Sequence, residues 1–361
     1  MLETPQRILI VKLGSIGDIV HTLPVLRTLR VSFPNAFIAW AVEEKLADLL
    51  YENPDLDEVI IISTKRWRKN LNLATLSEVM RTVRNLRAKS FDIVLDFQGL
   101  IKSGVVSFLT GAKNRAGFSR KDCREKANAL FTNRKARPFI NSGHVVDKNL
   151  SLLKKFQIEK FEPKFSLRSS PEAEASISSF CDNHADFFQK SVAAVNPGVG
   201  FPTKQWALDR FAKIADRVFR ELHLNILLTW GPGEKEKVEE IASQMEEKCL
   251  IAPPTTILES IALYQKLDLF IGGDTGPLHI CAALDIPTVS IFGPTDPGRN
   301  GAYGPGHTTA FKKLSCSFCY KRKCPTQNEC MLELKEEEVF EAILKNNYNA
   351  SVNPNSKKGI S

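Results

Sequence analysis

The sequence predicts an α/β fold made of two doubly wound domains, each with a parallel sheet. In both halves of the chain, apolar runs typical of buried strands alternate with segments of helical periodicity. Each half also begins with a strand that runs into a glycine-containing loop. A length of 361 residues exceeds one typical hydrophobic core, which favours two domains. We expect these domains to face each other across a cleft.

The domain boundary is expected where the strand–helix alternation fades, in a charged stretch with prolines over 159–171. This places an N-terminal domain at 1–165 and a C-terminal domain at 166–334. The last segment, 335–361, is expected to form an amphipathic helix over 335–345 and then a polar, disordered tail.

Four strands and two helices are predicted before this boundary. Apolar runs place the strands at 7–12, 36–42, 58–62 and 91–96. Helical spacing covers 19–33 and 78–89, and Pro24 near the start of the first helix predicts a kink there. A tight glycine loop, 13–18, joins the first strand to the first helix.

The second half shows the same alternation. Apolar runs place its strands at 191–195, 225–229, 267–271 and 288–292. Its predicted helices cover 207–221 and 234–247, and a third helix starts over 278–284.

The composition is that of an ordinary globular protein, with 43% hydrophobic and 25% charged residues. No run of about 18 apolar residues predicts a membrane-spanning helix. The N-terminal residues lead directly into a strand and lack a signal-peptide pattern, so we expect a cytoplasmic protein.

Positive charge is concentrated in the first half of the chain. Residues 1–160 hold 27 Lys and Arg against 16 Asp and Glu, whereas 161–361 hold 22 against 25, consistent with the overall +8. This asymmetry indicates an anionic partner, which is a nucleic acid, a phospholipid surface or an acidic glycan. Scattered surface lysines would give the same count.

Two strand exits in the second half are rich in glycine and small polar residues. The first runs from Phe270 to His279 and the second from Ile291 to Gly298. Asp274 and Thr275 are residue types that cap helices, and a helix N-terminus after a glycine turn is suited to bind phosphate. Neighbouring exits at the carboxyl edge of a parallel sheet are where doubly wound folds bind ligands. Two ordinary turns are the alternative.

The first glycine loop, Lys12 to Asp18, is not a dinucleotide-binding motif, because it lacks the G-x-G-x-x-G pattern. It also lacks the Lys-Ser/Thr ending of a Walker motif. Its distinctive group is Asp18 at a helix start. Asp18 is either a first-turn acid that stabilises the helix or a general base that faces the cleft.

Three segments resemble the bacterial lipopolysaccharide heptosyltransferases, glycosyltransferase family 9. They are Val11 to Pro24, Gly273 to His279 and Phe292 to Pro297. Two further segments, Lys65 to Lys69 and Asp96 to Ser103, are most like the heptosyltransferase I branch, which adds the first heptose to a Kdo sugar of the inner core. The resemblance covers about residues 7 to 345 and implies the metal-independent, two-domain GT-B architecture.

The resemblance implies an inverting transfer of heptose from ADP-heptose onto Kdo. It assigns Asp18 as the catalytic base and Lys204 as a phosphate-binding lysine, a mobile charge suited to a diphosphate. Thr275 and Gly276 would contact the same phosphates. An exposed loop position is the alternative for Lys204.

Three more residues complete the implied donor site. Asp274 matches a residue that binds heptose hydroxyls, and His279 closes the site. Glu234 follows a Gly-Pro-Gly turn and is a candidate ribose acceptor. A helix residue bonded to backbone is the alternative for His279.

The implied acceptor site lies in the basic half. Four cations surround one tryptophan in a segment expected to be a loop after a strand, namely Lys65, Arg66, Trp67, Arg68 and Lys69. This pattern suits the Kdo carboxylate and the lipid A phosphates, although a solvated charge run or a nucleic-acid patch would look the same. The resemblance adds Lys102, Arg120, Arg124 and His144.

Half of the eight cysteines are clustered. Cys316, Cys319, Cys324 and Cys330 are four thiols within fifteen residues, a donor set suited to tetrahedral zinc or iron. Such a metal would be structural, and free thiols or an oxidised pair are the alternatives. The isolated cysteines are expected to be reduced thiols, at positions Cys123, Cys181, Cys249 and Cys281.

The resemblance therefore implies an enzyme that needs no cofactor for catalysis and binds ADP-heptose, a Kdo–lipid A acceptor and, peripherally, the inner face of the inner membrane. No nucleic-acid partner is expected. The alternatives are a heptosyltransferase II-like enzyme that adds a later heptose, a nucleotide-dependent oxidoreductase or epimerase, and a basic nucleic-acid-binding module.

Overall fold

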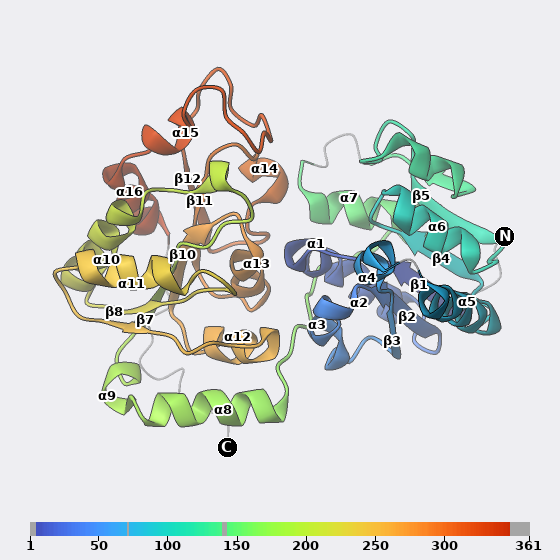
Figure 1. Ribbon diagram of the computed structural model, residues 1–361, viewed down its shortest axis with the longest axis horizontal. Helices are drawn as coiled ribbons and strands as arrows, with labels where there is room; N and C mark the ends of the chain where they lie inside the picture. Colours follow the sequence, from blue (N-terminus) through green and yellow to red (C-terminus); the bar gives the residue numbers. More distant parts are fainter. Residues whose placement is uncertain (1–4, 71, 139–142, 347–361) are drawn as a thin grey trace. The chain divides into compact units, whose positions relative to one another are not determined.

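Two compact units make up the chain in the computed structural model, which describes residues 5–70, 72–138 and 143–346 (Figure 1). The boundary lies between Arg168 and Ser169. Each unit contains one six-stranded parallel sheet, which confirms the predicted α/β fold. The predicted disordered tail lies, from residue 347 onward, outside the described residues.

The sheet of the first unit has the strand order β3-β2-β1-β4-β5-β6. Its strands are β1 (Arg7–Val11), β2 (Phe37–Val42), β3 (Glu58–Ile61), β4 (Ile93–Asp96), β5 (Asn114–Phe118) and β6 (Arg134–Ala136). The central strand β1 is apolar and almost wholly buried, as parallel strands covered on both faces require. The apolar runs in the sequence predicted the first four strands. They did not predict β5 and β6, which are short and contain charged residues.

Helices and short 3-10 turns connect these strands. They are α1 (Ile16–Val20), α2 (Leu23–Ser32), η1 (Glu44–Leu46), α3 (Asp48–Tyr51), α4 (Thr64–Lys69), α5 (Leu73–Ala88), α6 (Ile101–Leu109), η2 (Lys126–Leu130), α7 (Val145–Ser151) and η3 (Leu152–Phe156).

The single helix expected over 19–33 is wrong, because the segment forms two helices. The first, α1, begins at Ile16, and the Asp18 carboxylate accepts a hydrogen bond from the Ser15 N–H at 3.0 Å. The second, α2, begins at Leu23, and Pro24 lies in its first turn, where a missing N–H removes no helical bond. Pro24 therefore starts a helix instead of kinking one.

The basic segment 65–69 is also not a loop, because it forms most of α4. Lys and Arg have high helix propensity, and Trp67 anchors the helix by packing against the buried core of the unit. The cations of α4 are thereby held on a rigid turn of helix.

The sheet of the second unit has the order β12-β11-β10-β7-β8-β9, the same winding as the first. Its strands are β7 (Val192–Asn196), β8 (Asn225–Leu228), β9 (Cys249–Ile251), β10 (Leu269–Gly273), β11 (Thr288–Phe292) and β12 (His307–Phe311). Its helices are α8 (Pro171–Asp182), α9 (Ala185–Phe188), η4 (Pro202–Lys204), α10 (Leu208–Leu222), α11 (Lys235–Gln244), α12 (Ile257–Tyr264), α13 (Gly276–Ala283), α14 (Pro297–Asn300), α15 (Glu329–Leu332) and α16 (Glu336–Lys345).

The predicted C-terminal helix, α16, belongs to the core of the second unit. Val339, Phe340 and Ile343 are buried in the same cluster as β11 and α10 residues. The Asn346 side chain extends this contact by donating to the Thr288 carbonyl at 2.9 Å.

In both sheets every strand ends at the same edge, so the loops that follow the strands gather there. This edge positions the candidate residues of each unit. No helix in the described ranges is long and apolar enough to cross a membrane.

Candidate functional site

In the first unit, Asp18 lies where the chain leaves β1. One of its carboxylate oxygens lies 3.3 Å from the Lys12 ammonium, and the other caps α1 through the Ser15 N–H. About a third of the Asp18 side chain is exposed, whereas Lys12 is buried. Asp18 can therefore be both a helix cap and a reactive carboxylate, because one oxygen caps α1 and the other oxygen faces Lys12.

Charge around Asp18 keeps it ionised. Burial raises the pKa of Asp18, but Lys12, the Ser15 N–H and Arg124 outweigh that effect and hold the pKa below its ordinary value. Lys12 is itself fixed by donating to the Phe97 carbonyl at 3.0 Å. Asp18 is thus a pre-oriented anion with a cation beside it.

The loop that carries Asp18 is held by the loop after β4. Gln98 Oε1 accepts hydrogen bonds from the Leu13 and Gly14 N–H groups at 2.9 and 3.2 Å. Gly14 has a φ of +143°, and a Cβ there would lie 2.6 Å from Leu46, so only glycine suits this turn.

A buried carboxylate, Asp96, organises the loop after β4. It accepts hydrogen bonds from four donors, which are the Gln98 and Gly99 N–H groups, the Ser103 hydroxyl and the Asn128 amide. Burial nevertheless raises the pKa of Asp96. Lys12, Gln98 and Asp96 were not among the predicted site residues. The signal for them in the sequence is that they are polar residues at the ends of buried strands.

The acceptor candidates all follow strand ends at the carboxyl edge of the first sheet. The α4 residues follow β3, Lys102 opens α6 after β4, and Arg120 and Arg124 follow β5. His144 caps α7 by accepting from the Val146 N–H at 3.1 Å, and its ring meets the His21 ring edge-on at 5.3 Å.

Two of these cations are already paired. Arg66 lies 2.5 Å from Glu78, and Lys102 lies 3.5 Å from Glu43. Glu43 is buried and also accepts from the Thr64 hydroxyl, so it joins α6 to the start of α4. Lys65, Arg68 and Lys69 are exposed. The buried indole N–H of Trp67 has no hydrogen-bond partner within the described part of the chain.

In the second unit, the structure brings Lys204 and Asp274 together. The Lys204 ammonium donates to the Asp274 carboxylate at 2.6 Å and to its backbone carbonyl at 3.0 Å. Thr295 donates to the same carboxylate at 2.8 Å, and His279 lies 3.4 Å from its other oxygen. Three loops, after β7, β10 and β11, therefore converge on Asp274.

Asp274 is an ionised, buried acid. Burial raises its pKa, but His279 and Lys204 outweigh that effect and hold the pKa well below its usual range. Thr275 and Gly276 open α13 beside it, and the first N–H groups of any helix have no partner inside that helix. The arrangement can offer both positive charge and N–H donors to an anionic ligand. Thr295, which the sequence analysis left unassigned, was signalled only by its place in the second glycine turn.

Glu234 braces two loops of the second unit. Its carboxylate accepts from the Val199 and Gly231 N–H groups, each at 3.1 Å, and lies so close to Gly198 that a Cβ there would clash. These bonds link the loop after β7 to the loop after β8. They account for Glu234 structurally, and its ribose-binding role stays a prediction.

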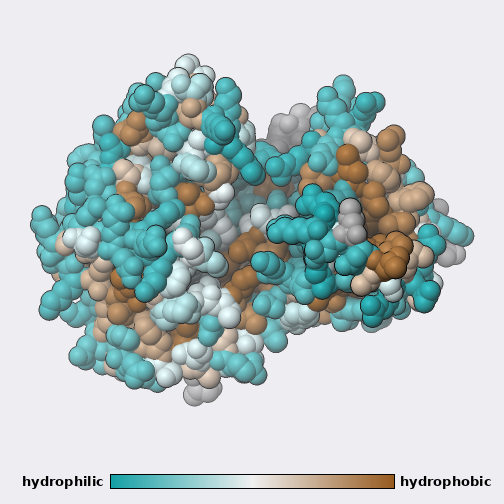
Figure 2. All heavy atoms as spheres, viewed as in Figure 1, coloured by the Kyte–Doolittle hydropathy of each residue, from teal (hydrophilic) through white to brown (hydrophobic). Residues whose placement is uncertain are grey.

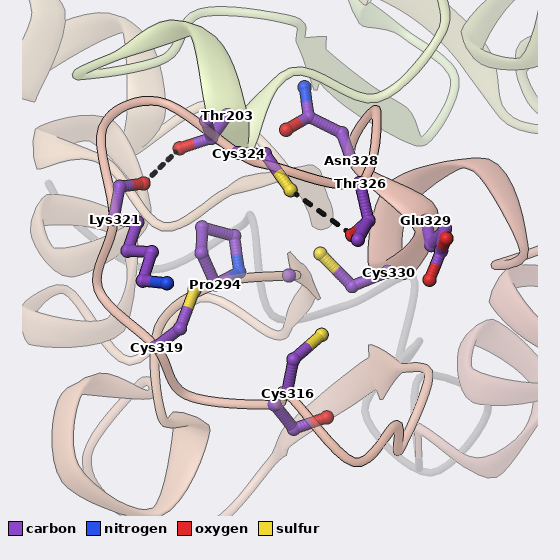
Figure 3. Close-up of a pocket in the computed structure, with 12 residues that line it drawn as sticks. Thr203, Pro294, Cys316, Cys319, Lys321, Cys324, Thr326, Asn328, Glu329 and Cys330 are labelled. Carbon is purple, nitrogen blue, oxygen red and sulfur yellow. Dashed lines mark hydrogen bonds between the residues drawn. The ribbon is translucent and has the colours of Figure 1, made fainter.

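The four clustered cysteines line one small pocket of about 10 Å³ (Figure 3). All four are free thiols, and Cys330 is buried while Cys316 is exposed. Burial, together with the other three thiols, raises the pKa of Cys330 to about 11. Hydrogen bonds at Thr326 lower the pKa of Cys324. Among the described residues, no group of three or more His, Cys, Asp and Glu side chains is arranged to hold a metal ion.

The cysteine loop contacts both sides of the Lys204–Asp274 pair. Thr203, next to Lys204, donates to the Lys321 carbonyl at 2.7 Å. The Tyr320 N–H donates to the carbonyl of Pro294, next to Thr295, at 2.8 Å. The loop is thus part of the frame that holds the donor candidates.

Comparison with known proteins identifies the family. The model of glycosyltransferase family 9 (heptosyltransferase) matches residues 79–329. Lipopolysaccharide heptosyltransferase 1 of Pseudomonas aeruginosa is 30% identical over 342 residues, which cover 92% of each chain.

Solved structures show the same fold. The glycosyltransferase family 9 protein of Veillonella parvula superposes with a TM-score of 0.80 at 23% identity, covering 96% of this chain and 98% of that one. The Escherichia coli heptosyltransferase WaaC, solved with ADP, gives a TM-score of 0.75 at 25% identity, covering 94% and 99%. The two parallel six-stranded sheets, the match over 79–329 and the relative in Pseudomonas together show that this chain belongs to glycosyltransferase family 9, the heptosyltransferases.

Proposed function

We propose that the chain is an inverting enzyme that moves heptose from ADP-heptose onto a Kdo sugar of the lipid A-linked inner core of lipopolysaccharide. Family membership and the relative named lipopolysaccharide heptosyltransferase 1 support heptose transfer. The observation that carries the proposal is Asp18, a partly exposed carboxylate held ionised by Lys12 at the sheet edge that carries the acceptor candidates.

In the proposed reaction, Asp18 accepts the proton of the acceptor hydroxyl as that oxygen attacks the anomeric carbon of the heptose. The bond from this carbon to the diphosphate breaks, its electron pair leaves with ADP, and the configuration inverts. Lys12 keeps Asp18 ionised before the reaction. Because the same charge weakens Asp18 as a base, its contribution comes from orientation as well as from basicity.

Lys204 and the start of α13 would stabilise the departing diphosphate. The Lys204 ammonium is pre-oriented by Asp274, and a lysine is a mobile charge that can shift from a carboxylate to a phosphate. Thr275 and Gly276 would add a hydroxyl and backbone N–H groups. Asp274 would then be free to accept hydrogen bonds from heptose hydroxyls. This scheme needs no catalytic metal.

We assign acceptor binding to the cations of the first unit. Lys65, Arg68 and Lys69 are exposed on α4, and Arg124 lies close enough to Asp18 to lower its pKa. Such a surface suits a carboxylate and phosphates. We expect the enzyme to act at the cytoplasmic face of the inner membrane as a peripheral protein.

We also propose a structural zinc or iron at the cysteine loop. Four thiols around one small pocket have the right donor chemistry, although their arrangement here is not a ligand group. Bound as thiolates, Cys316, Cys319, Cys324 and Cys330 would brace the loop that contacts Thr203 and Pro294. No step of the reaction passes through this metal.

The first prediction concerns Asp18→Asn. With ADP-heptose and a Kdo–lipid A acceptor, turnover should fall by roughly 100-fold or more, the scale of a lost general base. ADP affinity, measured by calorimetry, should change little because ADP binding is assigned to the second unit. Near-normal turnover would reduce Asp18 to a helix cap. The unmodified enzyme should use ADP-heptose in preference to UDP- and GDP-sugars, and the opposite preference would contradict the proposed donor.

The donor site is tested by Lys204→Ala and Asp274→Ala, with the exposed Lys213→Ala as a matched control. Lys204→Ala should weaken ADP binding and lower turnover, because its charge acts on the leaving diphosphate. Asp274→Ala should impair ADP-heptose more than ADP. Each change removes one partner of the Lys204–Asp274 ion pair and can destabilise the fold. The thermal unfolding temperature of each variant must therefore be measured together with its kinetics. ADP binding by folded Lys204→Ala at wild-type strength would disprove the phosphate assignment.

The basic helix is tested by the double variant Arg66→Gln and Arg68→Gln. The acceptor KM should rise at low salt, and the effect should shrink at high salt because screening weakens exposed charge pairs. Arg68 should contribute more than Arg66, whose charge Glu78 already offsets. The control is Lys154→Gln with Lys155→Gln, two exposed lysines of η3. If the acceptor KM of the double variant is unchanged at low salt, the cations of α4 do not bind the acceptor and are only solvated surface charges.

Metal content is tested by elemental analysis of protein purified without added metal. About one zinc or iron per chain is expected, and a chelator should release it while lowering the unfolding temperature. Cys330→Ser should lower the bound metal, whereas Cys181→Ser, which changes a thiol outside the cluster, should not. Metal-free protein with four titratable thiols in this loop would contradict the proposal.

A further inference from the structure

Large apolar side chains are exposed over α5, α6 and η2 of the first unit. Leu73 and Leu130 are 85% and 83% exposed, and Leu76, Met80 and Phe108 are each more than half exposed. Figure 2 shows hydrophobic residues gathered in this region, beside hydrophilic ones over α4. We call the set the apolar face, and it comprises Leu73, Leu76, Met80, Ile101, Phe108 and Leu130.

On α5 these residues form one stripe. Leu73, Leu76 and Met80 are spaced i, i+3 and i+7, so they lie on the same side of the helix. The helix has a separate side for the core of the unit, where Leu86 is buried. A helix that packs against a core needs only one apolar side. The stripe is therefore a second apolar side of α5, and no described residue covers it.

Exposed apolar residues also lie on the elements that neighbour α5. Arg87 of α5 donates to the Leu109 carbonyl of α6 at 3.0 Å, so the two helices lie side by side. Phe108 of α6 meets the Phe131 ring edge-on at 6.3 Å, which places η2 and Leu130 against α6. An apolar patch extended over three elements marks an interaction site in a soluble domain.

The charges around the apolar face are mostly positive, although Glu125 accepts a hydrogen bond from the Ile101 N–H at 2.6 Å. Helix α5 carries Arg81, Arg84 and Arg87 against a single acid, Glu78, which is paired with Arg66. Helix α6 has Lys102 and no acid. The exposed Lys65, Arg68 and Lys69 of α4 lie just before α5 in the chain.

We propose that the apolar face docks onto an anionic lipid bilayer, with its side chains among the acyl chains and the surrounding cations at the headgroup phosphates. Exposed leucines flanked by Lys and Arg are the pattern of surfaces that lie in a membrane interface. A second copy of the chain is the weaker alternative, since a two-fold contact through this face would bring cations against cations.

The position of the face links it to the acceptor site. The helices α5 and α6 both start at the carboxyl edge of the sheet, because each connects parallel strands. Leu73 and Ile101 therefore begin the face at the edge that carries the acceptor candidates. This inference rests on the proposed function for the identity of the acceptor, and it adds the surface through which a lipid-linked acceptor is reached.

The test compares two triple variants of the full chain. Leu73→Gln, Leu76→Gln and Met80→Gln remove the stripe and keep good helix formers. Val31→Gln, Leu332→Gln and Leu344→Gln change three exposed apolar residues elsewhere. Cosedimentation uses vesicles of phosphatidylcholine and phosphatidylglycerol in equal amounts. The stripe variant should partition at least about tenfold more weakly, since apolar burial adds to the charge attraction, and the control should match wild type.

Salt separates the apolar contribution from the electrostatic one. At high salt the binding of both proteins should fall, while the ratio between wild type and stripe variant persists, because screening does not act on apolar burial. Equal binding of the stripe variant and wild type would overturn the proposal. So would a concentration-dependent dimer, seen by sedimentation, that the stripe variant loses.

Insertion is measured on a folded single variant. Leu76→Trp should gain fluorescence that brominated acyl chains quench beyond any quenching of wild type, and no additional quenching would overturn the proposal. Turnover of the stripe variant on a detergent-dispersed acceptor should equal wild type. If heptose transfer is absent for every acceptor while the vesicle results hold, the proposed function fails and the docking surface stands.

Discussion

Parallel pairing of the strands is the constraint on which the rest of this structure depends. Consecutive parallel strands must be joined by a connection that crosses back over the sheet. All the loops that follow the strands therefore lie at the carboxyl edge of the sheet. In the first unit this brings Asp18, Lys102, Arg124 and the α4 cations to one edge, although Asp18 and Arg124 are more than a hundred residues apart in the chain. In the second unit the same constraint brings Lys204, Asp274 and Thr295 into contact.

Each edge contains an acid whose ionisation depends on neighbouring side chains. Removing a carboxylate from water disfavours its charge, and hydrogen bonds or a cation close by compensate. Lys12 does this for Asp18, and His279 with Lys204 does it for Asp274, but with different consequences. Asp18 remains partly exposed and can meet a substrate, whereas the second pair is almost buried and is held by three loops. The first arrangement suits proton transfer and the second suits a charge that moves to a ligand.

The first unit combines positive charge with an exposed apolar surface. Helix α5 exposes Leu73, Leu76 and Met80 beside three arginines, and α6 exposes Ile101 and Phe108, whereas α11 and α16 of the second unit carry more acids than cations. The proposed acceptor is attached to lipid A, and an enzyme for such an acceptor needs one part near a bilayer and another that binds a soluble nucleotide sugar. The division of surface chemistry between the units is consistent with that division of labour.

The sequence by itself determined eight of the twelve strands in the described part of the chain, because buried parallel strands are continuous apolar runs that local pattern reveals. It missed β5, β6, β9 and β12, which are short or rich in polar residues. It also indicated the two glycine-rich exits and the candidate residues Asp18, Lys204 and Asp274. Only the tertiary structure decided the partners of those residues, since Lys12, Gln98 and Thr295 reach them through folding and not through spacing. The helix of α4 and the division of 19–33 into two helices were likewise decided by packing and capping. Local periodicity records which side of a segment is apolar, but not which distant side chain completes its hydrogen bonds.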